Sequence, residues 1–541
     1  MKRLVLFILF AFAAAVQAQQ PVMPKSWEEP LPSGAMSDDY PLTADSQRND
    51  GVPVGKILNF PFEGSKIFPN TKRNISVYVP AQYKADKPAC VYAALDGLGF
   101  NAPVVFDNLI HKGELPVIIG IGTSSGDVPS ATGENPRHNR SFEFDGLSDN
   151  LGRFLIEEIF PFVEQQKTPD GLPIKLSKDP NDRCTGGGST GGIGAFTLAW
   201  ERPDQFRRVF SAIGTFVCMR GGDRYPVLVR KTEPKPLRIF LQDSSHDQWL
   251  GGPEVGDWWI SNVAVNRALE FSGYDVKHAW GTGPHSGAQA AQVFPDAMRF
   301  LWKDYPNPVK AQTDKTLNVF LKQILKPEQD WVPVAELQPK LNQRLAVDKD
   351  GNITCEDINV IKDTLPNGNY YTVDSDKGTL YLVKKDSTKI QQGENLKRPG
   401  GVAITPDGLW LAVIESGSHF GTSYQIKSDD TLEAGQRYYW FHVPDEDDEL
   451  GTGDCCFDEH GRLYVATRFG VSVLDRNGRT RAILPSPVRG GQASVSSVRF
   501  GGKNFDELYI ITDDKVFKRQ MNIKGSPVFR GKVKLPNWGA G

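Results

Sequence analysis

The stretch that decides the fold covers residues 183–196 and reads RCTGGGSTGGIGAF. It contains the pattern Gly-x-Ser-x-Gly, with Gly187, Ser189 and Gly191, between a strand-like beginning and a helix-like end. A serine at such a turn needs a strained backbone and an exposed hydroxyl, so the residues two before and two after it cannot carry bulky side chains. The stretch therefore predicts a nucleophile elbow. A phosphate-binding P-loop is excluded, because no Gly-Lys-Ser/Thr follows.

On both sides of this turn, from about residue 55 to 305, strand-like and helix-like segments alternate. The expected strands are 74–79, 90–95, 117–121, 183–185, 209–213, 237–241 and 275–280, and the expected helices include 146–166, 192–200, 261–272 and 296–303. Apolar strands separated by helices indicate a mostly parallel sheet with helices on both faces. We therefore expect an α/β domain over residues 56–308.

A serine nucleophile requires a base, an acid that orients the base, and donors for the oxyanion. After Ser189, the expected strand 237–241 leads to Asp243 and Asp247, and the strand 275–280 leads to His285 in a glycine-rich loop. This chain order, serine then acid then histidine, is the order of α/β hydrolases. We expect His285 to be the base, and both aspartates qualify as the acid.

These segments resemble the secreted serine esterases of the enterochelin-esterase and feruloyl-esterase type, a branch of the α/β-hydrolase fold. The resemblance covers roughly residues 55–305. It is carried by ISVYVPA at 75–81, ALDG at 94–97 and the elbow with its continuation AWERPD at 199–204, followed by the aspartate and histidine loops. It implies an α/β-hydrolase fold and ester hydrolysis.

The resemblance also implies roles for individual residues. Ser189 is the expected nucleophile, His285 the base and Asp247 the orienting acid, with Asp243 as the fallback acid. For the oxyanion hole, we expect backbone N–H groups of Thr190 and of the loop with Gly97 and Leu98. Loss of one such donor typically costs about 3 kcal/mol of transition-state stabilisation.

Arginine and tryptophan residues near these loops suggest a substrate class. Arginine can hold a sugar carboxylate in a bidentate pair, and flat aromatic rings can stack on sugar faces. Each residue alone is more typical of a surface ion pair or a packed core ring. Together they favour an anionic glycan, and the expected substrate-binding residues are Arg137, Arg140, Arg220, Trp249, Trp258 and Trp259. We expect demethylation of uronate methyl esters in pectin-type polysaccharide, with acetyl and feruloyl esters as alternatives.

After residue 308 the pattern changes. A bridging segment, 309–335, contains an expected helix at 317–325 and leads to short strands separated by turns at 348–351, 376–378, 406–408, 458–461 and 475–478. Each turn ends in glycine and is typical of a hairpin. Repeated hairpins predict an all-β propeller over residues 336–541, with about five or six blades.

This region resembles the gluconolactonase and senescence-marker type of propeller, through PGGVAITPDG at 399–408 and GRLYVAT at 461–467. Lactonases of that type bind a divalent metal through Glu, Asn and Asp side chains. Here the corresponding positions are Gly400-Gly401, Gln343 and Gly453, with Asp454 one residue beyond the last. We therefore expect no metal and no cofactor, and a structural or substrate-guiding propeller. A propeller-centred lactonase and a non-catalytic glycan-binding protein are the alternatives.

The remaining expectations concern the cellular location and the partners. Residues 1–18 have the charged, apolar and small-residue regions of a signal peptide, and residues 19–55 form an extended leader. A net charge of −3 argues against nucleic-acid binding. No later run is long and apolar enough for a membrane span. We expect a periplasmic or secreted protein whose partner is a polysaccharide or oligosaccharide ester.

Overall fold

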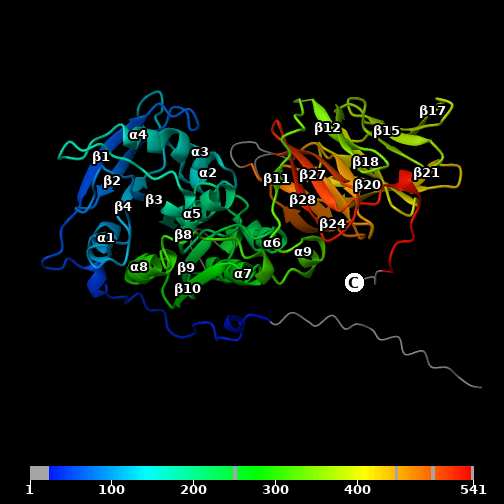
Figure 1. Cartoon of the computed structure of the whole chain (residues 1–541). Coiled ribbons are helices and arrows are strands. Elements are labelled where there is room, and N and C mark those ends of the chain that lie inside the picture. The colour runs from blue at the N-terminus through cyan, green and yellow to red at the C-terminus, as the bar shows by residue number, and fades with distance from the viewer. Residues whose placement is uncertain (1–22, 248–252, 341, 445–448, 489–493, 538–541) are drawn as a thin grey trace, which may run out of the picture.

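The computed structural model describes residues 23–247, 253–340, 342–444, 449–488 and 494–537. These residues form two domains that lie side by side (Figure 1). In this part of the chain, no helix combines the length and the apolar character needed to cross a lipid bilayer. The expected signal peptide, residues 1–18, lies outside the described residues.

The first domain is built on a mixed sheet of ten strands in the described part of the chain. Its order is β10 (Asp275–Gly281), β9 (Arg238–Ser244), β8 (Arg208–Ala212), β7 (Arg183–Gly188), β3 (Cys90–Leu95), β4 (Ile118–Thr123), β2 (Lys72–Val79), β5 (Asp127–Val128) and β6 (Arg137–His138), and β1 (Lys56–Glu63) also pairs with β2. The ladder from β10 to β4 is parallel. Strand β2 is antiparallel to β4, β1 and β5, so the sheet ends in an antiparallel edge.

Helices cover both faces of this sheet. The helices are α1 (Ala102–His111), α2 (Arg140–Phe144), α3 (Asn150–Arg153), α4 (Phe160–Glu164), α5 (Thr190–Glu201), α6 (Tyr225–Lys231), α7 (Trp258–Phe271) and α8 (Ala288–Leu301). One apolar core packs α1 and α8 against the sheet, with Phe106 and Phe294 at its centre. The other packs α5 and α7, with Phe196 and Leu269. All residues of β3 and β4 are buried, as expected for strands covered on both sides.

Each of the seven expected strands has a counterpart, but the expected helix 146–166 is divided. It consists of α3, a π-helical turn at Phe154–Ile159 and α4. The sequence analysis missed β1, whose alternating exposure and Pro61 fit an edge strand. It also missed α1, in which Pro103 and two valines weaken the helical pattern.

The second domain consists of antiparallel sheets arranged as a propeller-like region. Four sheets have four strands: β14 to β17 (Lys362–Thr364, Tyr370–Asp374, Thr379–Val383, Lys389–Gly393), β18 to β21 (Pro399–Ile404, Trp410–Glu415, Phe420–Ile426, Leu432–Trp440), β22 to β25 (Cys455–Phe457, Leu463–Thr467, Gly470–Leu474, Thr480–Leu484), and β26 to β28 (Val495–Gly501, Glu507–Thr512, Lys515–Gln520) joined by β11 (Val332–Pro333). A two-stranded sheet contains β12 (Gln343–Val347) and β13 (Ile353–Asp357).

The described residues therefore contain four complete blades, fewer than the five or six that we expected. The hairpin β12–β13 has no outer strands within the described residues. The expected turn glycines are confirmed as left-handed residues, for example Gly408 with φ 69° and Gly478 with φ 73°. Strand β11 lies in the segment expected to be a linker, yet it pairs with β28 near the end of the chain.

Polar contacts join the two domains. Arg519 of β28 forms a bidentate ion pair with Glu233, with N···O distances of 2.7 and 2.8 Å. The backbone of Thr232 pairs with Ile483 of β25. Helix α9 (Val319–Ile324) packs in the propeller core, while the Asn318 side chain before it donates to Arg230 O at 2.9 Å. The bridging segment thus contacts both domains.

Candidate active site

Ser189 lies between the end of β7 and the start of α5, with φ 57° and ψ −126°. Its N–H donates to Ala212 O at 2.9 Å, and its carbonyl accepts from Gly192 N at 2.8 Å and Thr215 N at 3.2 Å. A Cβ atom on Gly187 would lie 2.4 Å from Gly191 O. This close approach explains why the turn needs glycine at position 187, as a nucleophile elbow requires.

His285 contacts Asp247, which follows β9. Its Nδ1 lies 2.9 and 2.8 Å from the two carboxylate oxygens. The Asp247 side chain is fully buried, and the edge of the imidazole packs against Trp258 with ring centres 5.9 Å apart. The other ring nitrogen, Nε2, is buried and has no hydrogen-bond partner among the described residues. A histidine held through Nδ1 with a free Nε2 has the arrangement of a general base.

Asp243, the fallback acid, does not contact His285 in the hydrogen bonds of the described residues. It is fully buried at the end of β9, and its Oδ1 accepts from Ser244 N at 2.7 Å. Burial raises its pKa well above the ordinary value, and the charge of Asp247 acts in the same direction. The structure therefore brings Asp247 to the histidine.

The expected oxyanion donors lie at the N-terminus of α5 and in the loop after β3. In this loop Asp96 and Gly97 have φ angles of 62° and 91°, and a Cβ on Gly122 would lie 2.8 Å from Leu98 N. Within the described residues, the N–H groups of Thr190, Gly97 and Leu98 have no acceptor. Unpaired N–H groups beside a nucleophile can stabilise an oxyanion.

The expected substrate-binding arginines have different surroundings. Arg140 forms a bidentate pair with Asp96, with its Nη2 at 2.6 Å from Oδ2 and its Nε at 3.1 Å from Oδ1. The Arg220 guanidinium lies 5.4 Å from the ring centre of Phe142, which is 52% exposed. Arg137 is exposed on β6, and its Nε donates to Asn139. Phe142 was not predicted from the sequence, because one aromatic residue in the five-residue helix α2 carries no pattern.

The tryptophans do not form the sugar platform that we expected. Trp258 and Trp259 are 2% and 4% exposed, so their faces are not available for stacking. Trp258 packs on His285, and Trp259 packs edge-on against Trp280 at 5.2 Å. Trp249 lies outside the described residues. Adjacent tryptophans at the start of α7 are core residues here, and sequence alone does not distinguish a packed ring from an exposed one.

Like Phe142, Asp145 was not predicted from the sequence. It is a buried residue close to the start of α5. Its Oδ2 accepts from Thr190 Oγ1 at 3.4 Å. Burial raises its pKa, although Arg140 and Arg220 act to lower it. Both arginines therefore lie close enough to the start of α5 to influence charge there.

The N-terminal leader contacts the loop that carries His285. Thr282 N donates to the hydroxyl of Tyr40 at 2.8 Å, and Ser37 N donates to Thr282 O at 3.2 Å. His246, next to Asp247, also contacts Thr282 O through Nδ1 at 2.8 Å. The leader thus fixes the peptide three residues before His285.

In the propeller, the Asp454 carboxylate is surrounded by cations instead of by further oxygen ligands. It contacts Arg344 Nη2 at 2.5 Å and Arg499 Nη1 at 2.8 Å, and it accepts from Ser497 Oγ. Gln343 accepts from Lys340 N. Two guanidinium groups at the carboxylate do not fit a divalent metal, which needs several oxygen ligands free to bind.

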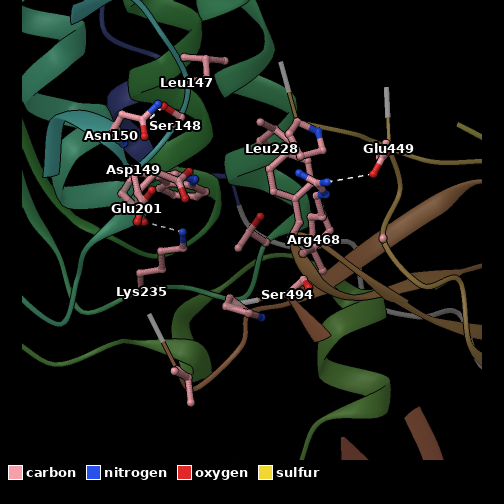
Figure 2. A pocket seen from close by; sticks show the side chains of 18 of the residues that line it. Leu147, Ser148, Asp149, Asn150, Glu201, Leu228, Lys235, Glu449, Arg468 and Ser494 are labelled. Atoms are coloured by element: carbon pink, nitrogen blue, oxygen red, sulfur yellow. Dashed lines mark hydrogen bonds and ion pairs between the residues drawn. The ribbon is translucent and has the colours of Figure 1, made fainter. Parts of the chain in front are cut away.

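A cavity of about 410 Å³ lies between the two domains, with Leu147 and Asn150 on one side and Arg468 and Ser494 on the other (Figure 2). Arg468 pairs with Glu449 at 3.1 Å. The lining includes Trp200 and Glu201 at the C-terminal end of α5. Since Ser189 precedes the other end of this 12-residue helix, about 18 Å of helix separates the cavity from the nucleophile.

Comparisons with known proteins agree with the two-domain organisation. Residues 65–289 match the family described as "Putative esterase", and residues 339–514 match the "SMP-30/Gluconolactonase/LRE-like region". These matches support the predicted fusion of an esterase-like domain with a propeller-like domain in one chain.

Similar solved structures include two esterases. The enterobactin esterase from Shigella flexneri is 17% identical, with a TM-score of 0.35, over 49% of this chain and 63% of that chain. The ferulic acid esterase from the anaerobic fungus Anaeromyces mucronatus is 16% identical, with a TM-score of 0.36, over 49% of this chain and 97% of that chain. The chain therefore spans less than two thirds of the enterobactin esterase.

Proposed function

We propose that the protein is an exported serine esterase that removes methyl groups from uronate esters in a pectin-type polysaccharide. The observation that carries the catalytic part is the His285–Asp247 contact, 2.8 Å at its shorter distance, together with the unpartnered Nε2 on the other side of the ring. The strained φ of Ser189 supports its role as the nucleophile.

In the proposed mechanism, His285 Nε2 accepts the proton of Ser189 Oγ as the oxygen attacks the ester carbonyl. The N–H groups of Thr190 and of Gly97 or Leu98 stabilise the oxyanion. The imidazolium, stabilised by Asp247, then gives its proton to the methoxy oxygen of the ester as the bond to the acyl carbon breaks, and methanol leaves. A water activated by His285 hydrolyses the acyl-enzyme and releases the free uronate.

The substrate part rests on two exposed arginines of the first domain. Arg220 and the exposed Arg137 are available for the carboxylates of neighbouring, unesterified uronates. The expected signal peptide supports an extracellular or periplasmic polymer as the substrate.

A specific observation favours a second candidate, a feruloyl esterase. The Phe142 ring is 52% exposed and lies under Arg220, so it could stack against an aromatic acyl group. For a propeller-centred lactonase the surroundings of Asp454 give no support, because two arginines occupy them.

The test is incubation of the full chain with methylated, acetylated and feruloylated polysaccharides, with methanol, acetate and ferulate measured separately. We expect methanol from methylated pectin and none from Ser189→Ala. Release of ferulate alone would replace the methylesterase proposal with the second candidate. If Ser189→Ala hydrolyses the ester as fast as the wild type and a chelator abolishes this hydrolysis, the activity belongs to a metal-dependent site and not to Ser189.

A further inference from the structure

Asp243 is a buried acid that the proposed mechanism does not use. It lies at the end of β9, opposite Trp280 of β10, and none of its surface is exposed. Its Oδ1 accepts one N–H, from Ser244, at 2.7 Å. Its Oδ2 is buried, and no N–H or O–H group among the described residues donates to it.

The charged groups that act on Asp243 are themselves acidic. Its side chain is within hydrogen-bonding reach of Asp247, and Asp257 also contributes a negative charge. An ionised Asp243 would thus be a buried carboxylate with an unpaired oxygen beside a second carboxylate, which is costly in a low dielectric. Two carboxyl groups in such contact favour a state in which one keeps its proton.

We propose that Asp243 is a neutral carboxylic acid that donates its proton in a hydrogen bond to Asp247, and so positions Asp247 against His285. The proton stays on Asp243 throughout the reaction, and no bond to substrate is formed. This assignment explains the orphaned Oδ2, since the atom is a donor and the adjacent carboxylate is its acceptor. Asp243 is then a positioning residue, and the inference rests on the proposed triad.

The assignment makes different predictions for an amide and for alanine at this position. Asp243→Asn keeps an N–H donor of the same shape, and we expect it to retain kcat within about threefold. Asp243→Ala removes the donor, and we expect kcat to fall about 10- to 100-fold, the effect of losing one hydrogen bond to a charged group. The loss of this donor should also change the pH dependence of kcat/KM in Asp243→Ala, whereas Asp243→Asn should keep the pH profile of the wild type.

A direct readout is the infrared band of a protonated carboxyl group in the resting full-length protein at neutral pH, with isotope-labelled aspartate. We expect the band in the wild type and its loss in Asp243→Asn. Absence of the band in the wild type would show that Asp243 is ionised and would overturn the proposal, even if Asp243→Ala fails to fold. An Asp243→Asn variant that loses as much activity as Asp247→Asn would overturn it as well.

Asp247→Asn separates this inference from the proposed function. We expect Asp247→Asn to lower kcat by about 10⁴-fold, as for the acid of a serine-hydrolase triad. If Asp247→Asn stays fully active, the proposed triad fails, whereas a missing carboxyl band removes only the role assigned to Asp243.

Discussion

The backbone of Ser189 stores conformational strain at the point where the chemistry is proposed to occur. A non-glycine residue at φ 57° and ψ −126° costs about 1–3 kcal/mol. Four backbone hydrogen bonds of this residue hold it in that conformation: its N–H donates to Ala212 O, and its carbonyl accepts from Gly192, Ile193 and Thr215. The strain exposes the hydroxyl, so stability and activity oppose each other at this residue.

This opposition gives a prediction for two variants that both lack the nucleophile. We expect Ser189→Gly to be more stable than Ser189→Ala by about 1 kcal/mol, because glycine adopts this φ without strain but loses more entropy on folding. Both variants should lack ester hydrolysis. Calorimetric unfolding checks the difference, and a Ser189→Gly variant no more stable than Ser189→Ala would show that the turn is unstrained.

At the scale of single residues, the sequence predicts that a serine, an aspartate and a histidine come together, but it does not predict which aspartate contacts the histidine. The elbow and the order Ser189, aspartate, His285 were readable because each follows an apolar strand. Asp243 and Asp247 follow the same strand, and only the turn after Ser244 decides which one reaches Nδ1. Phe142 lies in helix α2 and Asp145 directly follows it, and this helix of five residues is too short to give a periodic signal.

At the scale of elements, the leader acts on the catalytic loop. The loop between β10 and α8 contains Gly283 and Gly287, which increase its intrinsic conformational freedom. The hydroxyl of Tyr40 and the N–H of Ser37 hold both polar groups of the Thr282 peptide. The segment 19–55, expected only to extend from the domain, therefore helps to place His285.

We predict that Tyr40→Phe lowers kcat about tenfold with little change in KM, since it removes the acceptor of Thr282 N–H and lets His285 shift. Steady-state kinetics on a soluble methyl ester measures this. Tyr370→Phe, which removes a hydroxyl from the propeller strand β15, is the matched control and should behave as wild type. Unchanged kcat in Tyr40→Phe would show that the loop is rigid without the leader.

Elements were predictable where their periodicity was strong. Strand β3 matches its expected bounds, because its six apolar residues are all buried. The edge strand β1 and the helix α1 were missed, since proline and partial exposure weaken their patterns. Strand β11 has two residues, and its role depends entirely on pairing with β28, which lies far away in the sequence.

At the scale of the whole molecule, the domain contact contains a buried histidine between positive charges. His442 of the propeller is 7% exposed, and its Nε2 lies 3.1 Å from Lys231 Nζ of α6. Burial, Lys231 and Arg224 lower its pKa from 6.5 to about 3. The folded protein therefore binds this proton less tightly than the unfolded chain does.

It follows that the contribution of His442 to stability is fully present above pH 6.5 and is lost as pH falls from 6.5 towards 3. We predict that the Tm of the wild type drops between pH 7 and pH 5, and that His442→Gln shows a smaller drop. Thermal unfolding at both pH values tests this. An equal drop in both proteins would assign the acid sensitivity to other groups.

The number of blades could not be read from the sequence, because each Asp/Asn-Gly turn marks a hairpin and not a complete sheet. The hairpin β12–β13 has the same turn signal as the four-stranded sheets, but in the part of the chain that the structure describes it has no outer strands. The presence of two domains was predictable from the change of pattern after residue 308. The contact between Glu233 and Arg519 was not predictable, because the two residues are far apart in the sequence and no local pattern connects them.

The pairing of β11 with β28 sets an order of events during synthesis on the ribosome. Val332 is opposite Lys518, so the last sheet cannot close until nearly the whole chain has emerged. The first domain is complete long before that and can fold while the propeller is still being made. Until β28 has been made, the edge of β27 that pairs with it is open, and an open sheet edge can pair with another chain.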